Sequence, residues 1–322
     1  MIFAPIFKDY VWGGRNLEKF GRDLHGADKV AESWEIAAHK DGTTCVVNGK
    51  LAGQSLQTLL DNFGVCLVGT KNRWALKRGK FPFLVKILDA HQQLSVQVHP
   101  DDAYALENEN NELGKSEMWV VLWAKPEAEI IYGLSKKTTP DSLREAIKTG
   151  NLESYLNRIP IKAGDHVCVP AGTLHAIFDG TVLVEIQQNS NTTYRVYDWN
   201  RLGKDGKPRD LHIDKALDVI NYGQVGFTLP QPDRIETSRL GDSERLCRNP
   251  YFTVERHYLQ KGERVLGDCD GLTLEIWGVL SGEVNINGLL IQGVQFALLP
   301  ASLGVYQISA IKDSILLRAF AA

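Results

Sequence analysis

Three short segments recur in the same order in the two halves of the chain, and this repeat restricts the fold more than any other feature. The pairs are SVQVH with TVERH (95–99 and 253–257), EMWVVL with EIWGVL (117–122 and 275–280), and VPAGTLH with LPASLGV (169–175 and 299–305). Glu117 follows His99 by 18 positions, and Glu275 follows His257 by the same 18. In the first half, the third segment lies 28 residues farther along, beyond a stretch with helical character. We therefore expect two related units, the first carrying an insertion.

The repeated segments lie among short runs rich in β-branched and aromatic residues, separated by Gly, Pro and Asp, which is typical of strands. The expected strands are 83–88, 94–98, 118–123, 167–169 and 182–186. Helical spacing predicts fewer helices, at 54–62, 140–155 and 214–220. Thr139 is the expected N-cap of the second helix, with Pro140 in its first turn. The Pro- and Gly-containing stretch 223–250 indicates a domain boundary.

These patterns predict a mainly β fold built from two jelly-roll units. We expect residues 1–230 to form the first unit, with a helical insertion around 135–160, and residues 231–322 to form a second, degenerate unit. The stretch GDHVCVPAGTLH (164–175) is of the Gly-strand-Pro-x-Gly-x-x-His kind found in cupin barrels. Such barrels hold one metal ion among side chains that point inward from several strands.

Four residues of the first unit form a candidate metal site. Gln97 and His99 are two positions apart, so in a strand both side chains face the same side. Glu117 lies just before a strongly apolar strand, and His175 follows a Pro-Ala-Gly turn. Two imidazoles with oxygen ligands suit zinc, while manganese, iron, cobalt and nickel remain open. The lack of a thiolate favours a catalytic site over a structural one.

The remaining histidines are interpreted as structural or surface residues, with one exception. The structural or surface group is His25, His39, His91, His166 and His212. His257 has Glu255 and Glu275 nearby, which leaves a three-member site open in the second unit. Because the repeat places Val305 where the first unit has His175, a degenerate copy is the favoured interpretation.

Charge and composition exclude several classes of function. The net charge is −3 and no block of like charges occurs, which argues against nucleic acid or an anionic membrane as a partner. No stretch reaches the roughly 18 apolar residues of a membrane span, and Lys8 and Asp9 interrupt the apolar start, so we expect no secretory signal. The cysteines are Cys45, Cys66, Cys168, Cys247 and Cys269. Their odd number and scattered spacing favour reduced thiols in a cytoplasmic protein.

Over nearly its whole length the sequence resembles the type I phosphomannose isomerases (mannose-6-phosphate isomerases), in particular their short bacterial form. The matching segments, in the family's order, are YVWGG (10–14), FPFLVKILDAHQQLSVQVHPDD (81–102), GKSEMW (114–119), VPAGTLHA (169–176) and EIQQNSNTTYRVYDWNR (185–201). The combination of QVHP, KSE and PAGxxH is specific when the three occur together.

The resemblance implies a cytoplasmic, metal-dependent aldose–ketose isomerase that interconverts mannose 6-phosphate and fructose 6-phosphate through an enediol-type intermediate. It implies one zinc ion per chain on the four candidate ligands Gln97, His99, Glu117 and His175. It also implies a catalytic jelly roll with a helical insertion, followed by a second β domain. The family's active-site pocket falls on Ser95, Lys115, Glu185 and Arg195.

Roles within that pocket follow from residue chemistry. Lys115 and Arg195 would bind substrate and supply positive charge to the developing oxyanion or the phosphate, and Ser95 would also contact substrate. Glu185 is the best carboxylate for proton transfer, with a metal-bound water as the alternative. A purely structural pairing of Glu185 with Arg195 is the competing interpretation. The chain has Ser190-Asn191 where the family usually has Ser-Asp, so no acid–base role can be transferred to Asn191.

Three other functions remain open on the same scaffold. One is a different cupin enzyme such as an iron-dependent oxygenase, although a Gln ligand beside Lys115 and Arg195 fits an anionic sugar better. Another is a non-catalytic sugar-phosphate-binding protein, and the third is an isomerase for another sugar phosphate.

Overall fold

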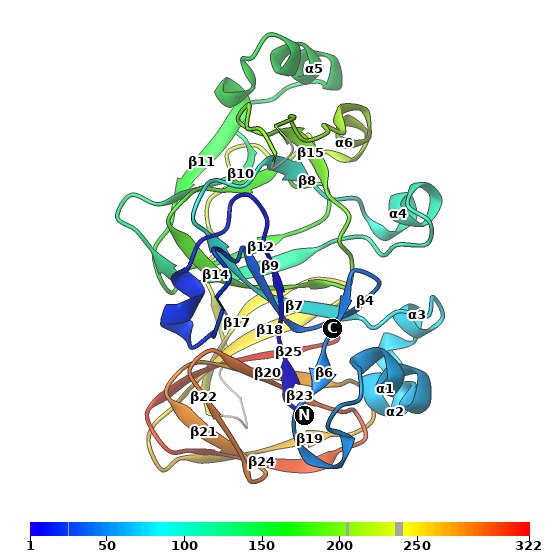
Figure 1. Ribbon diagram of the computed structural model, residues 1–322, viewed down its shortest axis with the longest axis vertical. Coiled ribbons are helices and arrows are strands. Elements are labelled where there is room, and N and C mark those ends of the chain that lie inside the picture. Colours follow the sequence, from blue (N-terminus) through cyan, green and yellow to red (C-terminus); the bar gives the residue numbers. More distant parts are fainter. Residues whose placement is uncertain (25, 204–205, 236–240) are drawn as a thin grey trace.

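The computed structural model describes residues 1–24, 26–203, 206–235 and 241–322. The fold is mainly β, as expected, and its main sheets are stacked along the long axis of the molecule, with helices α5 and α6 at one end (Figure 1). His25, interpreted from the sequence as a structural or surface residue, lies outside the described residues.

The first unit contains a five-stranded and a six-stranded sheet. The five-stranded order is β11-β10-β13-β8-β15: Leu156–Pro160, Glu129–Leu134, His175–Ile177, Val96–Val98 and Tyr194–Tyr197. The six-stranded order is β12-β9-β14-β7-β3-β2: His166–Val169, Glu117–Ala124, Thr181–Gln188, Phe83–Ala90, Glu32–Ile36 and Ile6–Lys8. Two short pairs flank them: β1 with β6 (Phe3–Ala4, Cys45–Val46) and β4 with β5 (Ala38–His39, Gly42–Thr43). Each of the five expected strands overlaps one of these, which confirms those predictions.

The second unit repeats this arrangement with a six-stranded and a four-stranded sheet. The six-stranded order is β16-β17-β18-β25-β20-β23: Asp233–Arg234, Asp242–Arg248, Thr253–Leu259, Ser314–Phe320, Glu275–Ser281 and Gln295–Leu299. The four-stranded order is β19-β24-β21-β22: Arg264–Cys269, Gly304–Ala310, Glu283–Ile286 and Leu289–Gln292.

Strand order shows how the two units correspond. Read from the opposite edge, β23, β20, β25, β18, β17 and β16 take the places of β12, β9, β14, β7, β3 and β2. An irregularity also recurs at matching places: the register shifts between Trp34 and Ile36 in the first unit and between Arg245 and Cys247 in the second. The repeat of EMWVVL with EIWGVL and of VPAGTLH with LPASLGV is therefore structural.

The first sequence match, of SVQVH with TVERH, is wrong: the two segments do not occupy corresponding places in the two units. TVERH lies on β18, which takes the place of β7, whereas Gln97 lies on β8 in the other sheet and His99 follows that strand. The shared spacing of 18 residues is a coincidence, which short segments allow. By strand order the counterpart of β8 is β19. Val305 on β24 takes the place of His175, and its cross-strand partner on β19 is Asp268.

A cluster of ion pairs surrounds Glu275 in the interior of the second unit. Arg318 donates to both carboxylate oxygens of Glu275, at 2.9 and 2.5 Å, and to Glu255 at 3.2 Å. Trp277 and Tyr306 also donate to Glu275. A guanidinium thus neutralises the carboxylates near His257, in agreement with a degenerate copy and not with a second metal site.

Successive side chains of a strand point to opposite faces of its sheet, and this alternation sets what each residue of the central strands contacts. Val85 and Ile87 of β7 join the large apolar core shared with Phe252 and Val254 of the second unit. Residues between them, such as Lys86, point the opposite way, into the first unit's barrel. Because both faces of β7 are buried, the strand is apolar except for Lys86, which faces the barrel interior, and Asp89, which accepts from Asn16.

Helices occupy the connections between strands. The α-helices are α1 to α6: Leu56–Phe63, Val65–Val68, Arg73–Leu76, Asp102–Asn108, Pro140–Lys148 and Ile213–Val219. The 3-10 turns η1 to η4 are Asn16–Phe20, Gly49–Leu51, Thr70–Asn72 and Leu152–Tyr155. The three expected helices form, but the second ends early, because Gly150 takes a left-handed φ of 72° between α5 and η4. Thr139 caps α5 as predicted, its side chain accepting from the Ser142 backbone N–H. None of the helices in the described ranges has the length and hydrophobicity that crossing a membrane would require.

The predicted boundary near residue 230 stays a proposal. Val225 still bridges to Leu134 of the first unit, and β16 at Asp233–Arg234 is the first strand of the second unit's sheet. The chain's start also crosses between units, since the Met1 amino group donates to Leu298 O at 2.7 Å. We therefore expect the two units to unfold together.

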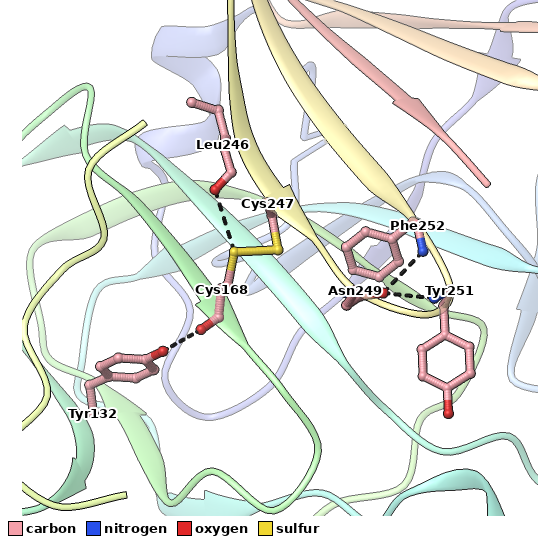
Figure 2. The surroundings of a disulfide bond; sticks show 7 residues. All are labelled: Tyr132, Cys168, Leu246, Cys247, Asn249, Tyr251 and Phe252. Atoms are coloured by element: carbon pink, nitrogen blue, oxygen red, sulfur yellow. Dashed lines mark hydrogen bonds between the residues drawn. A yellow bond between two sulfur atoms is a disulfide. The ribbon is translucent and has the colours of Figure 1, made fainter. Parts of the chain in front are cut away.

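A disulfide joins the two units, which corrects the expectation of five reduced thiols. Cys168 on β12 is bonded to Cys247 on β17, with their Cα atoms 5.8 Å apart (Figure 2). Packing of the two six-stranded sheets brings these residues together across a sequence separation of 79, which the spacing of cysteines could not reveal. The other three cysteines, Cys45, Cys66 and Cys269, are free.

Breaking this cross-link is expected to lower the free energy of unfolding by up to about 4 kcal/mol, because it closes a long loop in the unfolded chain. Cys168→Ser is the suitable variant, since Cys168 is half-buried and the new hydroxyl can donate to Leu246 O, which the sulfur contacts at 3.4 Å. Urea unfolding with and without reductant measures the effect, and Cys45→Ser at an exposed free cysteine is the control. An unfolding midpoint that does not respond to reductant would contradict the cross-link.

Candidate functional site

Three buried side chains from three strands converge inside the first barrel. His99 follows β8, Glu117 begins β9 and His175 begins β13. The potential ligand atoms of these residues all lie within 4.8 Å of one another, and they form the one such group of His, Cys, Asp or Glu in the described residues. His175 Nε2 lies 3.3 Å from Glu117 Oε1, and His99 Nε2 lies 3.5 Å from Glu117 Oε2.

Backbone carbonyls fix the orientation of both imidazoles. The His99 Nδ1 atom lies 2.9 Å from Thr192 O, and the His175 Nδ1 atom lies 2.8 Å from Thr173 O. Because a carbonyl only accepts, Nδ1 carries the proton in each ring, and each Nε2 presents a lone pair to the Glu117 carboxylate. Two nitrogen lone pairs and the carboxylate oxygens that they face repel one another in a buried site. A cation between these atoms would remove the repulsion.

Protonation equilibria agree with ligands that bind through lone pairs. Burial lowers the pKa of His175 to about 4 and, with the charge of Lys115, lowers the pKa of His99 well below its usual value. Both rings are therefore neutral near pH 7. Burial raises the pKa of Glu117 to about 8, helped by the nearby Glu185 and opposed by Lys115, so this carboxyl needs a bound cation to stay ionised near pH 7. Among the described residues, Glu117 Oε1 and His175 Nε2 have no hydrogen-bond partner, and Glu117 Oε2 is paired with Lys115 Nζ at 2.9 Å. The donor set fits a divalent cation.

Gln97, the fourth candidate ligand, lies beside this group. It is the direct cross-strand partner of His175 on β13 and of Arg195 on β15. Directly paired residues project to the same face of a sheet, so Gln97 shares the barrel side of both. Ser95, one position before β8, is buried at 5% exposure and also faces the cavity.

A cavity of about 260 Å³ opens beside the buried group. Six of the eight predicted site residues line it: Ser95, Gln97, Lys115, Glu117, Glu185 and Arg195. His99 and His175 do not line it, but each lies against the Glu117 carboxylate. Lys115 Nζ is 2.9 Å from Glu117 Oε2 and 3.0 Å from His99 Nε2, so it reaches the same point as the candidate ligands.

Sequence reasoning missed a buried charge cluster in this cavity. Lys86 Nζ lies 3.4 Å from Glu185 Oε2 and 3.4 Å from Glu32 Oε2. The two carboxylates raise the pKa of Lys86 against the opposing effect of its burial. The available signal was a single lysine inside the apolar run FLVKILDA, because a buried charge needs a partner.

Glu185 is paired with this cluster and not with Arg195. It also accepts from Trp119 Nε1 at 3.1 Å. Although burial works in the opposite direction, Lys115 and Lys86 lower its pKa to about 2, so it is ionised. The structural pairing of Glu185 with Arg195 that the sequence left open is thus not observed: Arg195 Nη1 instead donates to Asp210 O at 2.7 Å.

Asn191 also lines the cavity. Its amide donates to Asp41 Oδ2 at 2.8 Å. An aspartate at this position would set two carboxylates against each other, so the amide suits this chain. The residue holds the β4–β5 turn against the cavity rim.

Comparison with known proteins agrees with this geometry. The family profile "Phosphomannose isomerase type I, catalytic domain" matches residues 1–130. The probable mannose-6-phosphate isomerase GmuF of Bacillus subtilis is 38% identical over 96% of this chain and 95% of its own length. The chain belongs to the type I phosphomannose isomerase family. The mannose-6-phosphate isomerase of Streptococcus mutans is 43% identical over 76% of this chain and 74% of its own.

Structural likeness extends the family assignment to both units. The crystal structure of the mannose 6-phosphate isomerase from Bacillus subtilis superimposes with a TM-score of 0.84 at 32% identity. It covers 99% of this chain and 98% of that one. The second β unit is therefore part of the type I phosphomannose isomerase architecture shared by these two proteins.

Proposed function

We propose that this protein interconverts mannose 6-phosphate and fructose 6-phosphate. The observation that carries the proposal is the buried group of His99, Glu117 and His175 beside a cavity lined with lysines and arginines, in a chain of this family. A sugar phosphate needs a few local cations and no basic surface, in agreement with the net charge of −3.

We propose that Gln97, His99, Glu117 and His175 hold one zinc ion. Two neutral imidazoles, a carboxylate and an amide oxygen suit zinc among the common divalent metals. When bound, the metal supplies a Lewis acid that stabilises negative charge on the sugar oxygens near C1 and C2.

The reaction moves one proton from C2 to C1 of the aldose and a hydroxyl proton from O2 to O1. Glu185 is ionised and lines the cavity, so it can accept the carbon-bound proton and return it to the adjacent carbon. Lys115 and Arg195 provide positive charge for the oxyanion that develops in between. Ser95 can hydrogen-bond a sugar hydroxyl from the same wall.

Trp119 and Lys86 hold Glu185 in place from behind. Both also keep the carboxylate away from bulk water, which strengthens the electrostatic effect of every charge in the cavity. We further propose that the enzyme acts in the cytoplasm, where phosphorylated sugars are made and consumed.

An NMR assay of the purified protein tests this function. It monitors the conversion of mannose 6-phosphate to fructose 6-phosphate, with glucose 6-phosphate as a parallel substrate. We expect turnover of mannose 6-phosphate, with exchange of the C1 or C2 proton in heavy water. Turnover of another sugar phosphate alone would show that the protein is an isomerase with a different substrate. Saturable binding without any turnover would favour a non-catalytic sugar-phosphate-binding protein.

A further inference from the structure

The charges that line the cavity are distributed unevenly between its two walls. The three carboxylates, Glu32, Glu117 and Glu185, all lie on the six-stranded sheet. Lys86 and Lys115 are already paired with them at 2.9 to 3.4 Å. The opposite wall contributes two arginines, Arg195 on β15 and Arg209 in the segment that follows it, and no lining carboxylate among the described residues.

Arg209 is fixed from outside the cavity by Asp198. Its Nε and Nη2 atoms donate to Asp198 Oδ2 and Oδ1 at 2.8 and 2.5 Å, a two-point contact that sets the plane of the guanidinium. Asp198 is buried at 5% exposure, while the Arg209 side chain is 24% exposed and reaches the cavity. The remaining Nη1 of Arg209 has no hydrogen-bond partner among the described residues.

One carboxylate cannot neutralise the arginines around it. Arg201 Nη2 also donates to Asp198 Oδ1, at 2.6 Å, so two guanidinium groups share a single negative charge. Arg195 is close enough for the charge of Arg209, after burial, to lower the pKa of its guanidinium. Asp198 and Asp210 are the carboxylates that act on Arg195, so the three guanidinium groups of Arg195, Arg201 and Arg209 keep a surplus positive charge that an anionic ligand would balance.

We propose that Arg209 anchors the phosphate group of the substrate and that Asp198 is the positioning residue that aims it. The inference rests on the proposed function, which supplies a ligand with a reacting end and a dianionic end. Arg195 is the cross-strand partner of Gln97, so it lies toward the candidate metal ligands. Arg209 lies next to it on the same wall, since Arg195 donates to the carbonyl of Asp210 and both arginines line the cavity. Guanidinium suits phosphate because its planar donors match phosphate oxygens.

Comparing the wild type with Arg209→Met tests the proposal. The quantities to measure are the kinetic constants for mannose 6-phosphate and the inhibition constant of inorganic phosphate. We expect KM and the phosphate inhibition constant to rise together by about tenfold to a hundredfold, the usual effect of losing a hydrogen bond to a charged group. The turnover number should stay within about threefold, because the reacting carbons are held elsewhere. Arg209→Lys, which keeps the charge but not the two-point contact with Asp198, should show a smaller rise.

Arg201→Met is the matched control. It removes the other arginine that donates to Asp198, but Arg201 does not line the cavity, and its Nη1 donates to Gln93 O. Asp198→Asn should raise KM by less than Arg209→Met and leave the turnover number unchanged, a split that a loss of folding would not produce. Unchanged phosphate inhibition in Arg209→Met, or an equal rise in Arg201→Met, would overturn the proposal.

Calorimetric titration of the wild type and Arg209→Met with inorganic phosphate separates this inference from the proposed function, because it requires no turnover. Weaker phosphate binding by the variant supports the anchor even if mannose 6-phosphate is not the substrate. Equal phosphate binding by the two proteins, with an active wild type, would reject Arg209 while leaving the isomerase assignment intact.

Discussion

His99→Ala is expected to remove the bound metal and to lower turnover by at least about a thousandfold. The imidazole Nε2 and both Glu117 oxygens converge in a site that is 1% exposed. Losing one of two imidazoles leaves the Glu117 carboxylate buried with too few partners to hold a divalent ion. A metal that stabilises developing charge contributes several kcal/mol, which corresponds to about three or more orders of magnitude in rate.

Metal analysis of the purified variant, together with turnover, measures both consequences. His91→Ala is the control, because His91 is an exposed histidine away from the candidate ligands, and it should keep one metal ion per chain and normal turnover. Stoichiometric zinc in His99→Ala after dialysis would contradict the ligand assignment.

Arg195→Ala is expected to lower the turnover number by about a hundredfold to a thousandfold while zinc stays bound. Removing one preorganised charge donor from the site where an oxyanion develops typically has an effect of this size. Arg195 is the cross-strand partner of Gln97, and its Nη1 donates to the carbonyl of Asp210. Its buried Nε has no hydrogen-bond partner in the part of the chain that the structure describes, so it is available to substrate. Arg195→Lys should recover only part of the loss, because a point charge replaces a planar donor group.

Metal content and thermal melting of Arg195→Ala separate a catalytic loss from misfolding. Arg158→Ala, which removes a surface arginine paired with Glu129 and Glu153, is the matched control and should be fully active. Near-normal turnover of Arg195→Ala would reject the catalytic role of this residue.

The strands around the site were predictable because they are short runs of β-branched and aromatic residues bounded by Gly, Pro and Asp. All of β7 and most of β9 are buried, so their apolar sequences identified strands without any knowledge of their partners. The positions of the candidate ligands followed from local patterns as well: Gln97 and His99 are two residues apart, and His175 follows the PAG turn. The structure brings His99, Glu117 and His175 together as expected.

Features that depend on packing between distant segments were not predictable. The Cys168–Cys247 bond requires β12 and β17 to meet, and no local pattern encodes that contact. The match of TVERH with SVQVH failed because a five-residue similarity carries no information on which sheet a strand joins. Arg209 lacked a signal altogether, since its approach to the cavity depends on Asp198, 11 positions earlier.

The central claim, that the protein is a zinc-dependent isomerase, is tested most directly by measuring zinc content and turnover of mannose 6-phosphate on the same sample. Both are measured before chelation, after chelation and after zinc is restored. We expect one zinc ion per chain, loss of turnover when the ion is removed, and recovery in proportion to the zinc that rebinds. Full turnover in protein shown to contain no metal would contradict the role proposed for Gln97, His99, Glu117 and His175.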